Sequence, residues 1–356
     1  MDRGVAWRCR LLAAMVGVSI ALAGCGSQDP PGPTSVAASA VSSAAASAAP
    51  SPNASASASA ASSPAPSVRP SSAPAAVSFR VARSAIRLPA GRSRAVALAL
   101  GSGIVVCGGL TAAGTTGSIL HIDLATGQVS SAGALPSPVH DAAGSVLNGS
   151  GFIFGGGRFG PGSTVQGVSP AGLGVALGRL PANRADLVAV TVAGQLIVVG
   201  GGTTTFYDRR VLATTDGVHF KVIANLITGV RYPAVAVAGG LVYVIGGSTA
   251  AGNATAIQAL DPRTGVVRIV GHLAQGLAHA SAFVLGGAIL VAGGIAAGRA
   301  QDGLWRLDPA NGTVRPVGRL PYAVSDLAVV VDGTSAYLIG GETPGLIASI
   351  ISVSVR

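Results

Sequence analysis

Six polar residues recur at one fixed place in a repeating pattern, and their types could support chemistry. Each stands six positions after a leucine that marks a repeat unit, just before an apolar run: Arg94, Asp141, Asp186, Tyr232, His279 and Asp326. Carboxylate, imidazole and phenol groups can transfer protons, and together with guanidinium they bind charged or hydroxylated ligands. If the repeat closes on itself, these equivalent positions form one ring around a shared axis.

Other polar residues flank the ring positions along the chain. Four stand beside them (Arg92, His140, Arg184 and Arg231), and three follow in later connections of the units (Arg158, Arg299 and Glu342). The ring has two interpretations. Its side chains either form a ligand-binding mouth or hydrogen-bond to the next unit and fasten the ring, as buried polar groups normally do. We expect the aspartates to act mostly as fasteners, and Arg94, Tyr232 and His279 to be more exposed.

The sequence indicates neither a metal site nor a cofactor, and we assign no catalytic residue from it. His140 and His279 belong to different repeat units, and neither stands in a cluster with ligand spacing. Cys107 ends the apolar run that starts at Ile104. A cysteine in such a run is expected to pack as a small buried hydrophobe rather than act as a nucleophile.

The repeat that carries the ring is marked by glycine doublets. An apolar run ending in Gly-Gly recurs six times, beginning at Gly108, Gly155, Gly200, Gly246, Gly293 and Gly340. A leucine stands twenty residues before each doublet: Leu88, Leu135, Leu180, Leu226, Leu273 and Leu320. Glycine is expected here because neighbouring units approach too closely for a Cβ atom.

Within each unit the pattern predicts four antiparallel strands. In the fourth unit, Ala234–Val237 and Leu241–Ile245 flank a Gly-Gly turn, and Ala256–Leu260 and Val266–Val270 flank an Asp-Pro-Arg-Thr-Gly turn. Six such units predict an all-β, six-bladed propeller of four-stranded antiparallel blades. The doublets, the later turn and the Leu-Pro pairs resemble the kelch repeat over residues 77–356, although Trp305 is the only tryptophan there.

The two ends of the repeat region do not match its phase. The sixth unit stops after its third strand, near Ile350–Val355, and one strand, Phe79–Ile86, precedes the first unit. We expect this N-terminal strand to complete the last blade, as in kelch propellers, because it would cover an open sheet edge. The apolar stretch Leu277–Ala297 contains two glycine doublets in phase with the repeat, so it is predicted to be strands rather than a membrane helix.

The N-terminus predicts export. Three arginines within Met1–Arg10 precede a short apolar run, Leu11–Ala23, which is typical of a secretory signal. The exit Leu22-Ala23-Gly24-Cys25 resembles the lipobox of bacterial lipoproteins. That resemblance implies a signal peptide at residues 1–24, lipidation of Cys25, and anchoring on the extracytoplasmic face of a cell membrane.

Residues 25–76 are expected to be a lipidated cysteine followed by a disordered stalk. Between residues 30 and 76, 40 of 47 residues are Ser, Ala or Pro, and this composition cannot bury enough apolar surface to fold. The kelch-like propeller then occupies residues 77–356.

Two functions from different classes remain open. The net charge of +10 comes mostly from scattered arginines, which argues against nucleic acid as a partner. The first is a non-catalytic binding module, expected to be a monomer, that would present one propeller face to a protein, peptide or glycan. The alternative is an enzyme acting on an extracellular sugar at the channel. Sialidase and galactose-oxidase chemistry lack their residue sets here, so the resemblance leaves an epimerase-like activity as the enzyme alternative.

Overall fold

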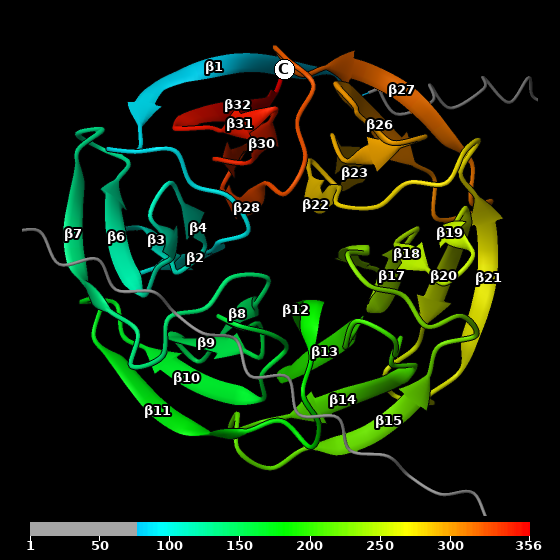
Figure 1. Cartoon of the computed structure of the whole chain (residues 1–356). Coiled ribbons are helices and arrows are strands. Elements are labelled where there is room, and N and C mark those ends of the chain that lie inside the picture. The colour runs from blue at the N-terminus through cyan, green and yellow to red at the C-terminus, as the bar shows by residue number, and fades with distance from the viewer. Residues whose placement is uncertain (1–76) are drawn as a thin grey trace, which may run out of the picture. The chain divides into compact units, whose positions relative to one another are not determined.

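The computed structural model describes residues 77–356, and in this range the chain is all β. Six four-stranded antiparallel sheets are arranged around a central axis like the blades of a propeller (Figure 1). This confirms the six-bladed fold predicted from the glycine doublets. The predicted signal peptide, Cys25 and the stalk lie outside the described residues.

The first three blades follow one another along the chain. Blade 1 is built from β2 (Val96–Leu100), β3 (Gly103–Cys107), β6 (Ser118–Asp123) and β7 (Val129–Ala134). Blade 2 is built from β8 (Ala143–Leu147), β9 (Ser150–Phe154), β10 (Thr164–Val168) and β11 (Gly174–Arg179). Blade 3 is built from β12 (Ala185–Val192), β13 (Gln195–Gly202), β14 (Arg210–Thr214) and β15 (Lys221–Asn225).

The other three blades complete the circle. Blade 4 is built from β16 (Ala234–Ala238), β17 (Leu241–Ile245), β20 (Ala256–Leu260) and β21 (Val267–His272). Blade 5 is built from β22 (Ser281–Leu285), β23 (Ala288–Ala292), β26 (Gly303–Leu307) and β27 (Val314–Arg319). Blade 6 is built from β28 (Ala328–Asp332), β29 (Ser335–Ile339), β32 (Ser349–Val355) and β1 (Phe79–Arg87).

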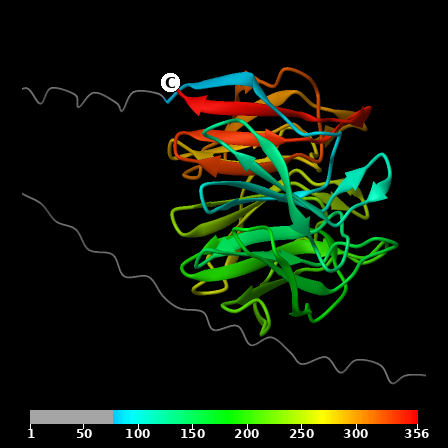
Figure 2. The same ribbon diagram turned by 90° about the vertical axis from the view of Figure 1, so that its left-hand side faces the viewer.

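The closure of blade 6 by the N-terminal strand is also confirmed. β1 pairs antiparallel with β32, from Phe79 opposite Val355 to Arg83 opposite Ile351, and continues to Arg87 after a bulge. Figure 2 shows the two strands, cyan and red, lying side by side. The strand extends one residue beyond the predicted Phe79–Ile86. Phe79 is buried in the core between blades 5 and 6, so the strand contributes packing as well as hydrogen bonds.

The connection between the second and third strands differs among the blades. In four blades it forms a two-residue ribbon: β4 (Leu110–Thr111) with β5 (Gly114–Thr115), β18 (Ser248–Thr249) with β19 (Gly252–Asn253), β24 (Ile295–Ala296) with β25 (Arg299–Ala300), and β30 (Glu342–Thr343) with β31 (Gly345–Leu346). Blades 2 and 3 have irregular loops there. The repeat pattern of the sequence did not predict these ribbons.

The glycine doublets join each blade to the next. In every doublet the second glycine donates its N–H to a carbonyl four residues after the next marker leucine, as from Gly109 to Val139 at 2.7 Å and from Gly341 to Arg92 at 2.9 Å. The first glycine faces the same carbonyl, and a Cβ there would lie at most 2.8 Å from its oxygen. Both glycines also have positive φ. These positions therefore require glycine, for the reason predicted from the sequence.

The core is divided into six apolar clusters, one between each pair of neighbouring blades. The middle strands are apolar on both faces and bury both against adjacent blades, as in β3, all of whose residues are buried. The apolar stretch Leu277–Ala297 is part of this core and forms the hairpin of β22 and β23. Residues 77–356 contain no helix of the length and apolarity that a membrane span needs.

Candidate functional site

The six ring positions share one unusual backbone conformation. Each lies just before or at the start of the innermost strand of its blade, and each has a φ between 51° and 62°. This left-handed region is uncommon for residues other than glycine, and for Tyr and Arg it carries strain. The same conformation at six equivalent positions means that the fold imposes it.

The reason for this conformation is a closed ring of backbone hydrogen bonds. The N–H of each ring residue donates to the carbonyl of the ring residue in the preceding blade: Asp141 to Arg94, Asp186 to Asp141, Tyr232 to Asp186, His279 to Tyr232, Asp326 to His279, and Arg94 to Asp326, at 2.8–3.2 Å. The backbone thus fastens the six blades at the hub. The side chains are left to gather around the axis.

The ring surrounds the mouth of a central channel. A cavity of about 630 Å³ is lined by the ring residues and by the innermost strands of all six blades. Below the ring its walls are mostly alanine and valine, for example Ala97, Val188, Val237 and Val284. The channel is therefore open, with an apolar interior and a polar rim at one end. We call this rim, made of the six ring residues together with Glu342 and Arg231, the collar.

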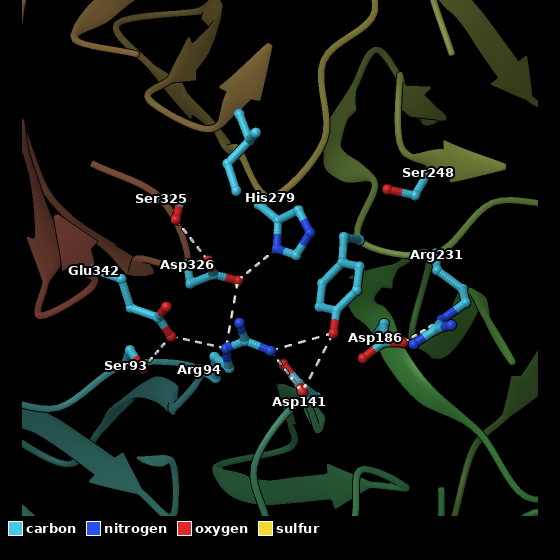
Figure 3. A network of polar contacts seen from close by, with 12 residues as sticks. Ser93, Arg94, Asp141, Asp186, Arg231, Ser248, His279, Ser325, Asp326 and Glu342 are labelled. Atoms are coloured by element: carbon cyan, nitrogen blue, oxygen red, sulfur yellow. Dashed lines mark hydrogen bonds and ion pairs between the residues drawn. The ribbon is translucent and has the colours of Figure 1, made fainter. Parts of the chain in front are cut away.

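Arg94 is the centre of the collar (Figure 3). Its Nε donates to Glu342 Oε1 at 2.8 Å, and its Nη1 donates to Asp141 Oδ2 at 3.2 Å and to the Tyr232 hydroxyl at 3.3 Å. Asp326 Oδ1 lies 3.9 Å from Nε. One guanidinium of blade 1 thus contacts carboxylates of blades 2 and 6, and its side chain is still 23% exposed.

On the opposite side of the axis, two aromatic rings are stacked. Tyr232 and His279 have ring centroids 3.7 Å apart, at an interplanar angle of 22°. His279 Nδ1 lies 2.7 Å from Asp326 Oδ1, and Asp326 Oδ2 accepts a hydrogen bond from Ser325 at 2.6 Å. Asp326 therefore orients the imidazole, in the manner of the carboxylate partners of catalytic or ligand-binding histidines.

The three ring aspartates are buried and paired with other blades. Their side chains are 9% (Asp141), 1% (Asp186) and 4% (Asp326) exposed. Asp141 is bonded to Arg94 of blade 1, Asp186 to Arg231 at the start of blade 4, and Asp326 to His279 of blade 5. This is the geometry that the fastener interpretation requires of them. Arg94 and His279 are the more exposed members.

Burial and crowding of charge shift several pKa values in the collar. Burial raises the pKa of Asp141 to about 7, against the effect of Arg94, and the nearby charges of Asp186 and Asp326 add to the rise. Burial and the charge of Asp141 raise the pKa of Tyr232. Burial also tends to raise the pKa of Asp326, but the hydrogen bond and charge of His279, together with Arg94, hold it below its ordinary value. Asp141 is thus the carboxyl poised to exchange a proton near neutral pH.

Not all the polar residues that flank the ring in sequence join the collar. Arg92 and Arg184 are buried inside their blades, where Arg92 Nη1 donates to the carbonyls of Gly108 and Ser118 at 3.2 Å, and Arg184 forms an ion pair with Asp208 at 2.7 Å. The two arginines therefore stabilise the blades from within. Arg158, in a loop, and Arg299, in the short strand β25, are both exposed, and neither is hydrogen-bonded to a collar residue.

His140 lies next to the collar. Its Nε2 is 3.6 Å from Asp141 Oδ2, and its Nδ1 is hydrogen-bonded to Thr115 at 2.9 Å. Burial and the charge of Arg94 lower the pKa of His140. The imidazole is therefore uncharged over much of the neutral range and adds little positive charge to the mouth.

Glu342 is more important than its sequence position indicated. It is the only glutamate of the chain and follows the last glycine doublet. In the structure its Oε1 accepts hydrogen bonds from both Arg94 and Ser93. An isolated antiparallel bridge between Ser325 and Glu342 brings Glu342 next to the ring residue Asp326. The sequence feature that could have identified Glu342 as a site residue is that the single glutamate of the chain stands directly after a glycine doublet.

Within the described part of the chain, no three His, Cys, Asp or Glu side chains are grouped so that they could hold a metal ion. Cys107 is buried, and burial raises the pKa of its thiol to about 12. The collar therefore offers proton exchange, hydrogen bonding and charge, without a preformed metal site among residues 77–356.

Comparison with known proteins supports the fold alone. No model of a protein family matches the chain, and no curated protein matches it by sequence. A solved structure described as the structure of YjhT is similar to this chain, with a TM-score of 0.65 and 17% sequence identity. The match covers 76% of this chain and 99% of that chain, so the described propeller corresponds to nearly the whole of that protein.

Proposed function

We propose that the protein is a binding module, anchored to the extracytoplasmic face of a membrane, whose ligand enters the mouth of the propeller channel. The observation that carries the proposal is the channel of about 630 Å³ behind a polar collar whose arginines, His279 and Glu342 remain partly exposed. Binding sites for small ligands are concave and mostly apolar, with a few convergent polar groups. The ligand is a small molecule, or a protruding group of a peptide or glycan.

Strain in the collar supports this proposal. Fastening is done by the backbone ring, which glycine would form with less strain than Arg, Tyr or His. Three positions nevertheless carry large polar side chains, Arg94, Tyr232 and His279, and these contact one another across the mouth. Strained residues with convergent side chains are typical of ligand sites. The ring therefore serves both interpretations: its backbone and its buried aspartates fasten the blades, and the side chains of Arg94, Tyr232 and His279 face the ligand.

Membrane anchoring rests on the Leu-Ala-Gly-Cys exit alone. In a bacterium that processes lipoproteins, we expect Cys25→Ser to release the protein from the membrane fraction or to leave an unprocessed precursor. Fractionation followed by mass measurement of the N-terminus distinguishes these outcomes. Normal processing and full membrane retention of the variant would contradict anchoring through Cys25.

Binding at the channel mouth predicts a specific effect of narrowing the channel. Ala97 lines the cavity below the collar and also packs against the apolar core between blades 1 and 6. Ala97→Phe therefore adds bulk at the channel wall, and its melting curve is compared with that of the wild type to show that the fold is kept. We expect the mature protein, applied to arrays of peptides and glycans, to bind a defined subset. Ala97→Phe should weaken that binding at least about tenfold, or about 1.4 kcal/mol.

A matched control separates channel binding from binding elsewhere. Val222 is exposed on the outer strand β15, so Val222→Phe adds similar bulk far from the axis along the blade. This variant should keep the full binding profile. Array binding that is unchanged in Ala97→Phe would disprove the proposed function. If binding is also reduced in Val222→Phe, the ligand lies on the outer strands.

A second candidate function is an enzyme that moves protons on a sugar at the channel mouth. It is favoured by two groups: Asp141, with its pKa raised to about 7, and the His279–Asp326 pair. Two positioned acid–base groups facing one cavity are what proton abstraction and return require. Turnover of a ligand found on the array, lost in both Asp141→Asn and His279→Gln, would favour this function over simple binding.

A further inference from the structure

A second cavity lies between blades 4 and 5. Its volume is about 280 Å³, and it shares no lining residue with the collar or the channel. Gln275, in the connection from β21 to β22, lines one side, and Trp305 of β26 lines the other. Much of the remaining wall is apolar, as at Leu273 and Val291.

In two other blades, the protein fills the equivalent place with an amide of its own. Gln258 follows the bulge in the third strand of blade 4 and is 1% exposed. Its Oε1 accepts a hydrogen bond from the Thr228 N–H at 3.0 Å, and its Nε2 donates to the Thr228 carbonyl at 3.0 Å. Gln166 of blade 2 makes the same two bonds to Ser137, at 2.8 and 3.0 Å. Each primary amide is thus held by both backbone groups of one residue, two positions after a marker leucine.

Blade 5 has the same loop but not the glutamine. Gln275, like Thr228, is the second residue after its marker leucine, and the two loops bend at the same positions. The residue after the bulge in the third strand, however, is Trp305. The backbone N–H and C=O of Gln275 form no hydrogen bond with any residue between 77 and 356. The donor and acceptor that hold a glutamine amide in blades 2 and 4 are therefore open in blade 5.

Trp305 cannot supply the missing amide. An indole has one donor and no acceptor. Its six-membered ring lies over Gly303, where a Cβ atom would clash with it. Blades 1 and 3 have a buried leucine at this position, Leu120 and Leu212, whereas Trp305 is half-buried. The indole therefore forms part of an accessible wall beside the open backbone of Gln275.

We propose that the cavity beside Trp305 binds the side chain of a glutamine in a partner peptide. This site is separate from the one in the proposed function, because no channel residue takes part. The glutamine amide would accept a hydrogen bond from the Gln275 N–H and donate one to the Gln275 carbonyl, as Gln258 does with Thr228. Its methylene stem would pack on the indole, which offers a large apolar face.

Two bonds to the backbone of one residue restrict the ligand to a primary amide. The N–H that donates must lie on the same side as the C=O that accepts. In a trans secondary amide the N–H points away from the C=O, and the cis form is rare. Peptide bonds and acetamido groups of sugars are therefore excluded. A carboxylate has no donor for the Gln275 carbonyl.

Trp305 provides a direct readout, since it is the single tryptophan of residues 25–356. Its fluorescence is followed while the mature protein is titrated with Nα-acetyl-glutamine methylamide. The controls are the same probe with its side-chain amide N-methylated, and Nα-acetyl-glutamate methylamide. We expect a saturable change in emission with the glutamine probe and at least about tenfold weaker binding of both controls. Butanamide, which has the amide without a peptide backbone, should bind more weakly than the glutamine probe.

Two variants at one position complete the test, with binding measured by isothermal titration and the fold checked by melting curves. Trp305→Gln supplies the glutamine of blades 2 and 4, so it should bind its own loop and weaken binding of the probe at least about tenfold. Trp305→Phe is the matched control, because it also lacks the indole but brings no amide. It should bind the probe within about threefold of the wild type.

Four results would overturn the proposal. They are equal binding of the glutamine probe and its N-methylated form, no binding of any probe up to about 10 mM, equal binding by the two Trp305 variants, and tighter binding of butanamide than of the glutamine probe. Ala97→Phe should leave binding of the glutamine probe unchanged, and weaker binding in this variant would place the probe in the channel instead. The site beside Trp305 and the channel site can therefore fail independently.

Discussion

We expect a chain that begins at Pro89 to lose the propeller fold, and a chain that begins at Ala76 to melt like the full-length protein. The first truncation removes β1, which pairs with β32 and buries Phe79, and it also removes the buried Leu88 that follows the strand. Burial of one aromatic side chain is worth about 3–5 kcal/mol, and Leu88 adds about 2–5 kcal/mol. Together these approach the whole stability of a typical domain.

The truncations are compared by thermal melting and by size-exclusion chromatography. Without β1, the strand β32 becomes an open edge with unpaired backbone groups, so the Pro89 chain should also aggregate. The chain from Ala76 is the matched control, since it keeps Val77, which packs against the same apolar cluster. If the two chains melt alike and both stay monomeric, the N-terminal strand does not close the ring.

The second large effect is expected from Arg94→Ala. Arg94 neutralises Asp141 and Glu342 and lies near Asp326, and its loss leaves these carboxylates without a cation at the mouth. Removing one partner of a buried ion pair destabilises by about 3–5 kcal/mol, and because Arg94 is partly exposed we expect about 2–3 kcal/mol. Arg299→Ala is the control: this arginine is exposed, and its removal should change stability by less than about 0.5 kcal/mol.

The loss in Arg94→Ala should grow with pH. Asp141 ionises near pH 4 when unfolded but at about pH 7 when folded, so between these values the folded state holds the extra proton. Its contribution to stability is therefore present at low pH and declines as pH rises from about 4 to 7. Without Arg94 the pKa of Asp141 rises further, and the decline extends above about pH 7, where the wild type levels off.

Denaturant unfolding of the wild type and Arg94→Ala between about pH 5 and pH 9 measures this difference. The gap in the free energy of unfolding should widen as pH increases. A gap that is constant, or that narrows toward high pH, would mean that Arg94 does not control the ionisation of Asp141.

The blade number, blade architecture and closure could be predicted from the sequence because the fold repeats its constraints. Each doublet, as at Gly108 and Gly109, meets the same steric limit and makes the same bond to the next blade. Six copies of one constraint produce a period that stands out from the rest of the sequence. The closing strand was predictable because a lone strand at one end and an incomplete unit at the other complement each other.

The collar could be predicted only in part. The six ring positions were visible because their polarity recurs in register, but the left-handed backbone and the hydrogen bonds between them leave no mark on residue type when Arg, Tyr and His are used. The pairing of Arg94 with Glu342 joins residues 248 positions apart and occurs only at the junction of blades 1 and 6. The burial of Arg92 and Arg184 was likewise missed, because it depends on carbonyls of later strands. Interactions that do not repeat cannot be read from a repeat.

The claim that the channel mouth binds the ligand is tested most directly by a crystal structure of the mature protein with the tightest array ligand. The account predicts ligand density within the collar, with a polar atom in hydrogen-bond distance of Asp141 and a part that passes Ala97 into the channel. Density on the outer strands, or in the smaller cavity beside Trp305, with an empty channel, would contradict the account.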